Sequence, residues 1–254
     1  MLGRTRLAAI LTAVAAIGVL AGPVAQADTS VGASVSRTGA VLEMTRPVPV
    51  VGTGDPVISV VPTEVAWTRH TSWLTYGYRS LLEGQVVTVD GAVPNAAVKL
   101  YARPVGQSGW SYVATRRTSS ATGIFRFDMH KPVRKTDYRV IYGPEWAYTA
   151  SRAYVTVNVK RKITSTVTRN SDGTFTMTGS IAPKSAGKTV RLQRKKCGSC
   201  SYSTIKSITA SSTSTYRFRF TGPTTRGTWY FRAYTPSDSG FLTSYSGYWT
   251  IRRS

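Results

Sequence analysis

The chain has 254 residues and a formal net charge of +22 at pH 7, because 33 lysines and arginines face only 11 aspartates and glutamates. Such sparse and scattered acidic residues do not suggest the carboxylate pair of a glycosidase. The sequence also lacks a Gly-x-Ser-x-Gly elbow and a complete phosphate-binding P-loop. A charge excess of this size instead predicts attraction to polyanions, weakened by salt.

The first 27 residues have the pattern of a secretory signal peptide. Arg4 and Arg6 precede an apolar stretch from Leu7 to Ala21, and Ala25-Gln26-Ala27 provides small residues at a cleavage site. The apolar stretch is short for the alternative, an N-terminal membrane helix. We therefore expect residues 1–27 to be removed and the remainder to carry no transmembrane anchor. The protein is expected to be secreted, and either extracellular or loosely associated with the cell envelope.

Composition divides the rest of the chain into three parts. Residues 28–64 are rich in Val, Thr, Ser, Gly and Pro and have no helical period, which predicts an extended linker or arm. Residues 65–159 and 160–254 have short alternating runs separated by turn residues, which predicts many antiparallel strands. The charge rises along the chain, since residues 160–254 hold 17 basic and 2 acidic residues, against 12 and 5 in residues 65–159.

The second half of this region repeats the first at an offset of 91 to 95 residues. Gly84 matches Gly179 in an early strand. The other matched segments are 97–101 with 189–193, 124–127 with 215–218, 138–140 with 231–233, and 153–157 with 247–251. Two tandem domains of about 90 residues each are a suitable size for β-sandwiches.

Alternation along the strands also predicts which side chains face the core. In residues 124–127 and 215–220 the aromatic side chains should be buried and the arginines between them exposed. Exposed basic positions then recur in both domains, as Lys99 with Arg191, Arg126 with Arg217, and Arg139 with Arg232.

The order of these motifs resembles a known class of module. The motifs are the Asp90-Gly91 turn with Pro94 behind it, Val98-Lys99-Leu100, a hairpin with Trp110, Phe125-Arg126-Phe127 and Tyr138-Arg139-Val140. They resemble the Ig-like β-sandwich modules of exported actinobacterial proteins, and the first module also resembles carboxypeptidase regulatory-like domains of the transthyretin type. The resemblance covers residues 65–251 and implies an all-β fold of two tandem antiparallel Ig-like β-sandwich domains. It implies roles as spacers, adhesins or accessory domains, although many such modules accompany an enzyme domain that this chain lacks.

The two cysteines, Cys197 and Cys200, lie in a predicted hairpin between two strands, with Gly198 and Ser199 at its tip. Their Cα atoms should lie about 5.5 Å apart, and the oxidising space outside the cell favours a disulfide. A redox pair would need a helix N-terminus, and a zinc site would need four ligands. An intermolecular disulfide is the remaining alternative. We expect no metal and no cofactor.

Neither histidine suggests a catalytic centre. His130 and Asp128 could meet at a strand end, whereas His70 has no acidic residue near it in sequence. Aromatic residues in hairpins and loops could stack on sugar rings or bases, but packing against the core is the favoured interpretation, even for Trp146, the best candidate for exposure. These residues are Trp110, Tyr112, Trp146, Tyr148, Trp229, Tyr245 and Tyr248.

Together these features predict a secreted, non-enzymatic protein whose basic second domain binds an anionic cell-wall polymer or an acidic polysaccharide. Nucleic acid would bind it only non-specifically. The alternative is a protein-interaction or spacer module that partners another exported protein. The candidate binding residues are Arg191, Arg194, Lys195, Lys196, Arg217 and Arg219.

Overall fold

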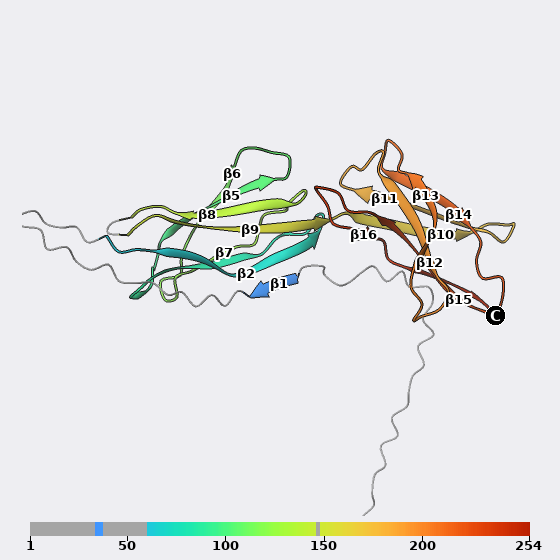
Figure 1. The fold of residues 1–254 in the computed structure, drawn as a ribbon, viewed down its shortest axis with the longest axis horizontal. Coiled ribbons are helices and arrows are strands. Elements are labelled where there is room, and N and C mark those ends of the chain that lie inside the picture. The colour runs from blue at the N-terminus through green and yellow to red at the C-terminus, as the bar shows by residue number, and fades with distance from the viewer. Residues whose placement is uncertain (1–33, 38–59, 146–147) are drawn as a thin grey trace, which may run out of the picture.

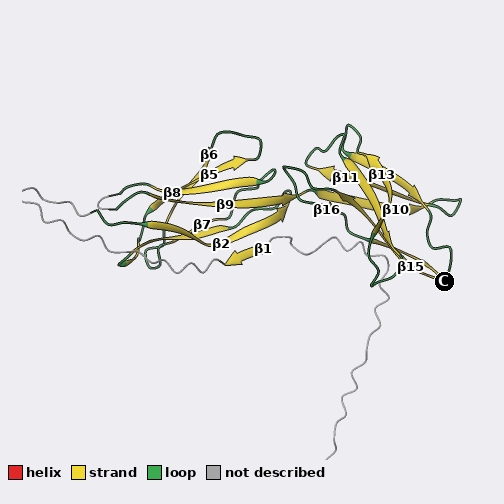
Figure 2. Cartoon of the chain, in the orientation of Figure 1, coloured by secondary structure: helices red, strands yellow, loops and turns green. Residues whose placement is uncertain are grey.

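The structure is a computed structural model that describes residues 34–37, 60–145 and 148–254. Throughout these residues, segments in which apolar residues alternate with polar ones form strands. Within these residues every regular element is a β-strand, so the predicted all-β class is confirmed (Figure 2). The strands form two bodies that follow one another along the long axis of the molecule (Figure 1). The predicted signal peptide and most of the predicted linker lie outside the described residues.

The first domain is a sandwich whose two layers are linked by strand β9, which pairs with a strand of each layer. One layer contains β2 (Glu64–Thr75), β3 (Leu82–Thr88), β4 (Gly91–Ala92) and β7 (Ile124–Phe127). The other contains β5 (Ala97–Pro104), β6 (Ser111–Arg117), β8 (Thr136–Tyr142) and β9 (Ser151–Lys160). β2 pairs antiparallel with β3 and in parallel with β9, and it also pairs with β1 (Ser34–Arg37).

The second domain repeats this arrangement with separate sheets. Three strands form one sheet, in the order β10 (Lys162–Arg169), β11 (Phe175–Ala182) and β14 (Thr215–Phe220). The other sheet has the order β13 (Ser203–Thr209), β12 (Thr189–Lys195), β15 (Gly227–Thr235) and β16 (Ser244–Tyr245), and β17 (Trp249–Arg253) also pairs with β15. The matched sequence segments therefore fall on equivalent strands, namely β5 with β12, β7 with β14, β8 with β15, and β9 with β17.

Each domain has its own core, made from the faces that alternation predicts. Phe125 and Phe127 are buried in the first core, while Tyr216, Phe218 and Phe220 are buried in the second. The arginines between them are exposed, as expected.

The matched glycines have a shared structural role in these cores. Gly84 pairs with Phe125 across β3 and β7, and Gly179 pairs with Tyr216 across β11 and β14. A Cβ atom at either position would overlap the aromatic ring and a backbone oxygen of the neighbouring strand. The aromatic side chain of the partner strand lies over its glycine in both domains, which explains why the repeat places glycine there.

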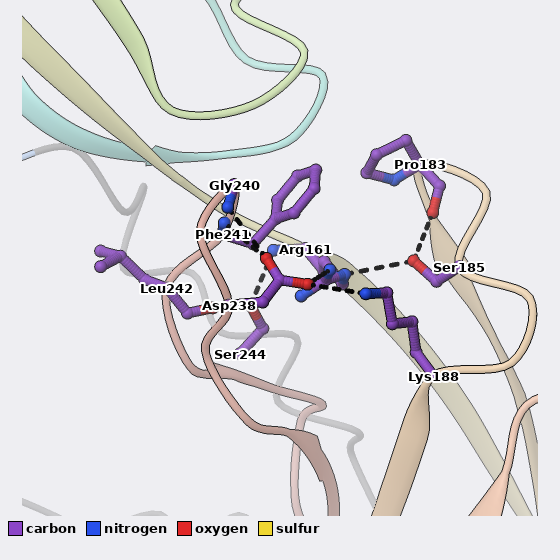
Figure 3. Close-up of polar contacts among 9 residues, drawn as sticks. All are labelled: Arg161, Pro183, Ser185, Lys188, Asp238, Gly240, Phe241, Leu242 and Ser244. Atoms are coloured by element: carbon purple, nitrogen blue, oxygen red, sulfur yellow. Dashed lines mark hydrogen bonds and ion pairs between the residues drawn. The ribbon is translucent and has the colours of Figure 1, made fainter. Parts of the chain in front are cut away.

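The two domains are joined through Arg161, the one residue between β9 and β10 (Figure 3). A loop of the second domain lies against the first, because the Lys135 N–H donates to the Gly240 carbonyl at 2.8 Å and Phe241 packs on the first core. The Leu242 N–H donates to the Val159 carbonyl at 2.9 Å. The junction is therefore a packed contact with hydrogen bonds from both sides.

Candidate functional site

The cysteine hairpin lies at the end of β12. Cys197 and Cys200 form a disulfide with their Cα atoms 5.1 Å apart, so the predicted intrachain bond is confirmed. The connection is longer than a tight hairpin, because β12 ends at Lys195 and β13 begins only at Ser203. Within it the Lys195 ammonium donates to the Gly198 carbonyl at 2.6 Å, which ties the cationic side chain to the bridged turn.

The register of β12 against β15 brings cations and tyrosines together on the outer face of this sheet. Three cross-strand pairs alternate with the buried positions: Arg191 with Tyr234, Gln193 with Arg232, and Lys195 with Tyr230. Because successive side chains of a strand point to opposite faces, all six lie on the side away from the core. All are partly exposed.

Arg232 is at the centre of this group. Its guanidinium carbon lies 3.8 Å from the ring centre of Tyr202 and 3.9 Å from that of Tyr245. Its Nε donates to the Gln193 side-chain oxygen at 2.9 Å. Two rings and an amide therefore hold the guanidinium in one position, at distances where cation–π attraction is favourable.

The contacts continue in both directions from Arg232. On one side the Lys195 ammonium lies 5.3 Å from the ring of Tyr202 and 4.7 Å from that of Tyr230, which in turn contacts Tyr248. On the other side Tyr245 stacks on Tyr234 at 5.6 Å between ring centres, and the Tyr234 hydroxyl accepts a 2.7 Å hydrogen bond from Arg191. We name this continuous group the cation–tyrosine face; it consists of Arg191, Lys195, Tyr202, Tyr230, Arg232, Tyr234, Tyr245 and Tyr248.

No carboxylate of the second domain neutralises this face. Residues 160–254, all of which the structure describes, contain only Asp172 and Asp238 as acidic residues. Asp172 pairs with Arg219 on the opposite sheet. Asp238 pairs with Arg161 at 2.6 Å and with Lys188 at 3.2 Å at the domain junction. Both carboxylates are thus engaged elsewhere.

The structure divides the six predicted binding residues among three places. Arg191 and Lys195 belong to the cation–tyrosine face. Arg194 and Lys196 stack on Trp229, with the cations 4.5 Å and 5.7 Å from its ring centre. Arg217 and Arg219 lie on β14, in the opposite sheet.

Sequence reasoning named Tyr245 and Tyr248 only as residues that could stack on sugars or bases, and it did not include Arg232, Tyr202, Tyr230 and Tyr234 in the candidate site. The recurrence of Arg139 and Arg232 in the repeat was the available signal for Arg232. The tyrosines come from three separate segments, the 196–202 loop, β15 and the C-terminal part of the chain from β16 onward. Only the strand register brings them together.

The histidines do not form a catalytic pair with an acid. His130 Nδ1 is 2.5 Å from the Tyr138 hydroxyl, whereas Asp128 pairs with Arg126 at 3.4 Å. Burial lowers the pKa of both His70 and His130. Among the described residues no group of three or more His, Cys, Asp and Glu side chains could hold a metal ion. Trp146 lies outside the described residues.

No protein-family model and no curated protein matches the chain. Many solved structures are similar to it in fold, and two serve as examples. One is a tetra-tandem repeat from the extending region of a large adhesion protein, with 14% identity and a TM-score of 0.34 over 73% of this chain, and the chain spans 48% of that structure. The other is the selenomethionine-substituted chicken interferon gamma receptor alpha chain, with 9% identity and a TM-score of 0.41 over 76% of this chain and 98% of that one. Both similarities concern the fold alone.

In the part of the chain that the structure describes, no helix is long and apolar enough to span a bilayer.

Proposed function

We propose that this chain is a secreted, non-enzymatic protein that binds an anionic polymer of the cell envelope or its surroundings through the cation–tyrosine face of the second domain. The observation that supports this most directly is the placement of three cations among five tyrosines on a face that no carboxylate of that domain neutralises.

The arrangement fits a polymer that carries both charge and sugar rings. The guanidinium of Arg232 is held by Tyr202, Tyr245 and Gln193, so its remaining N–H groups are preorganised to donate to a carboxylate or phosphate. Tyr245 is 40% exposed and offers a ring edge against which the apolar side of a sugar can pack. An acidic polysaccharide or a phosphate-bearing wall polymer meets both requirements.

Other cations of the domain extend the positive field without joining the face. Arg194 and Lys196 stack on Trp229, which packs on the core side of the sheet, and Arg194 shares a hollow there with Arg219. Arg217 and Arg219 point away from it on the opposite sheet. A polymer held on the face would therefore gain long-range attraction from these four residues and direct contact from the residues of the face itself. Nucleic acid would be attracted by the same field without recognition of its sequence.

The second candidate is a spacer module for another exported protein. The packed junction around Arg161 favours it, because a spacer needs domains whose relative position is fixed. A spacer would tolerate the neutralisation of Arg232 and Lys195 without loss of function, whereas polymer binding would not.

The deciding experiment is sedimentation of the protein lacking residues 1–27 with purified bacterial cell walls, across a salt series. Walls are compared before and after removal of their teichoic acid. We expect co-sedimentation that decreases with salt and with removal of the anionic polymer. Absence of binding, or binding that is indifferent to salt, would contradict polymer recognition and leave the spacer role.

A further inference from the structure

The first domain has its own aromatic site, in the position that corresponds to the cation–tyrosine face. A hollow on the outer side of the β5, β8 and β9 layer is lined by Arg103, Trp110, Asp137, Tyr154, Val155 and Thr156. The rings of Trp110 and Tyr154 lie 6.0 Å apart between centres and are inclined at 56°. Tyr154 is 54% exposed, so its ring can be reached from solvent beside the hollow.

Two arginines hold Trp110 in place. The guanidinium carbons of Arg103 and Arg139 each lie 4.7 Å from its ring centre. Arg139 also lies 5.2 Å from the ring of Tyr101. The tryptophan comes from the loop before β6 and not from a strand, so these contacts fix a ring that would otherwise be free to move.

The polar side chains of the hollow form hydrogen bonds with one another. The Asp137 carboxylate accepts a 3.1 Å hydrogen bond from Arg103 and a 2.7 Å hydrogen bond from the Thr156 hydroxyl. Each carboxylate oxygen has a further lone pair, and the guanidinium has further N–H groups. Acceptors and donors thus lie next to each other, beside two aromatic rings.

The register shows how this site differs from its counterpart. Arg103 pairs with Asp137 across β5 and β8, where the second domain pairs Lys195 with Tyr230 across β12 and β15. The same cross-strand position is therefore an ion pair in the first domain and a cation beside a ring in the second. The two charged residues that line the hollow, Arg103 and Asp137, thus neutralise each other, while Arg139 keeps its charge against the rings of Trp110 and Tyr101.

This chemistry selects a neutral ligand. The only charged side chains that line the hollow, Arg103 and Asp137, are paired with each other, so the lining offers no net charge to attract an ion. Rings that can cover the apolar side of a pyranose, next to paired donors and acceptors for its hydroxyls, fit a sugar. We propose that the hollow formed by Trp110, Tyr154, Asp137, Arg103 and Thr156 binds a neutral sugar unit of a polysaccharide. This site is additional to the proposed polyanion-binding face and does not depend on it.

The test is titration of the protein lacking residues 1–27 with four neutral oligosaccharides, followed by calorimetry and by saturation-transfer NMR. The probes are hexamers of α-linked glucose, β-linked glucose, mannose and N-acetylglucosamine. We expect saturable binding of at least one of them. Trp110→Ala and Tyr154→Ala should each weaken that binding by about tenfold, which corresponds to about 1.4 kcal/mol for a lost stacked ring.

Two controls make the result specific. Tyr78→Ala removes an aromatic side chain that is 49% exposed but lies outside the hollow, and it should leave sugar binding unchanged. Trp110→Phe keeps a ring at the site and should restore part of the affinity lost in Trp110→Ala, which excludes simple misfolding. None of these substitutions alters the charge, so sedimentation with anionic walls should be unaffected and reports separately on the proposed function. Failure of all four oligosaccharides to bind, or binding that survives both alanine substitutions, would overturn the proposal.

Discussion

Arg161 and Asp238 form an ion pair at the domain junction, with the guanidinium nitrogen 2.6 Å from the carboxylate oxygen. The Arg161 side chain is only 3% exposed, while that of Asp238 is 31% exposed. The guanidinium also lies 4.1 Å from the ring centre of Phe241, and its Nε donates to Ser185 at 3.2 Å (Figure 3). A buried cation at the junction is thus surrounded by groups of the second domain, which hold the loop that contacts the first.

Substitution of Asp238 should loosen this junction. Asp238→Asn leaves the buried guanidinium without a counter-charge, and we expect the free energy of unfolding to fall by about 2 kcal/mol in urea denaturation. The matched control is Asp172→Asn, which breaks the exposed pair with Arg219 and should have a much smaller effect. Equal effects of the two substitutions would show that the Arg161 pair has no special structural importance.

The same pair predicts a pH dependence. Burial by itself would raise the pKa of Asp238, but hydrogen bonds from Arg161 and Lys188 outweigh it and lower the pKa below its ordinary value. The stabilisation is therefore complete above the unfolded pKa of about 3.9 and is lost as the pH falls through the lower folded pKa. The difference in melting temperature between wild type and Asp238→Asn should be constant near neutral pH and shrink below about pH 4. Asp172, whose pKa is also lowered, is present in both proteins and cancels in this comparison. A difference that persists unchanged to pH 2 would contradict the role of the Asp238 carboxylate.

The repeated glycines should tolerate no side chain. Gly84→Ala and Gly179→Ala each place a methyl group where an aromatic ring and a backbone oxygen already lie, and we expect each to cost about 3 kcal/mol of stability. Gly198→Ala is the control, because the nearest atom to a Cβ there is the Tyr230 hydroxyl oxygen at 3.8 Å. Thermal denaturation of the three variants decides the point, and a stable Gly179→Ala protein would refute the packing argument.

The disulfide should stabilise its loop and not the domain. It joins residues separated by 3 positions, so it constrains the unfolded chain only slightly, and its loss returns little entropy to the unfolded state. We expect the double substitution of Cys197 and Cys200 by serine to lower the free energy of unfolding by about 1–2 kcal/mol and to leave the circular dichroism spectrum unchanged. Unfolding of the protein by a reductant at room temperature would contradict this.

Local patterns were sufficient to predict much of the fold. Alternation placed Phe125 and Phe218 in the core, and the repeat aligned β7 with β14 before either sheet was known. The hairpin position of Cys197 and Cys200, with the expected oxidising environment, was enough to predict their bond. These features depend on residues that are close in sequence or on a period of two along a strand.

The remaining features depend on contacts between distant segments. In the sequence Arg161 is one of several cations in a basic junction. It becomes part of a buried ion pair only because the loop containing Asp238 folds back against it. In the same way, Tyr202 and Tyr245 are separated by most of a domain and meet on the guanidinium of Arg232 through the register of β12 and β15. Sequence patterns do not predict such contacts between distant residues until the pairing of the strands is known.

The most direct test of polymer recognition is the salt dependence of the affinity for polygalacturonate, an acidic polysaccharide. Lys195→Gln combined with Arg232→Gln removes two cations of the cation–tyrosine face, while Arg217→Gln combined with Arg219→Gln removes the same charge from the opposite sheet. We predict that the first pair weakens binding strongly and makes the slope of log affinity against log salt shallower by about 1 to 2, whereas the second pair changes the slope little. Equal effects of the two pairs, or no effect of either, would contradict binding through the cation–tyrosine face.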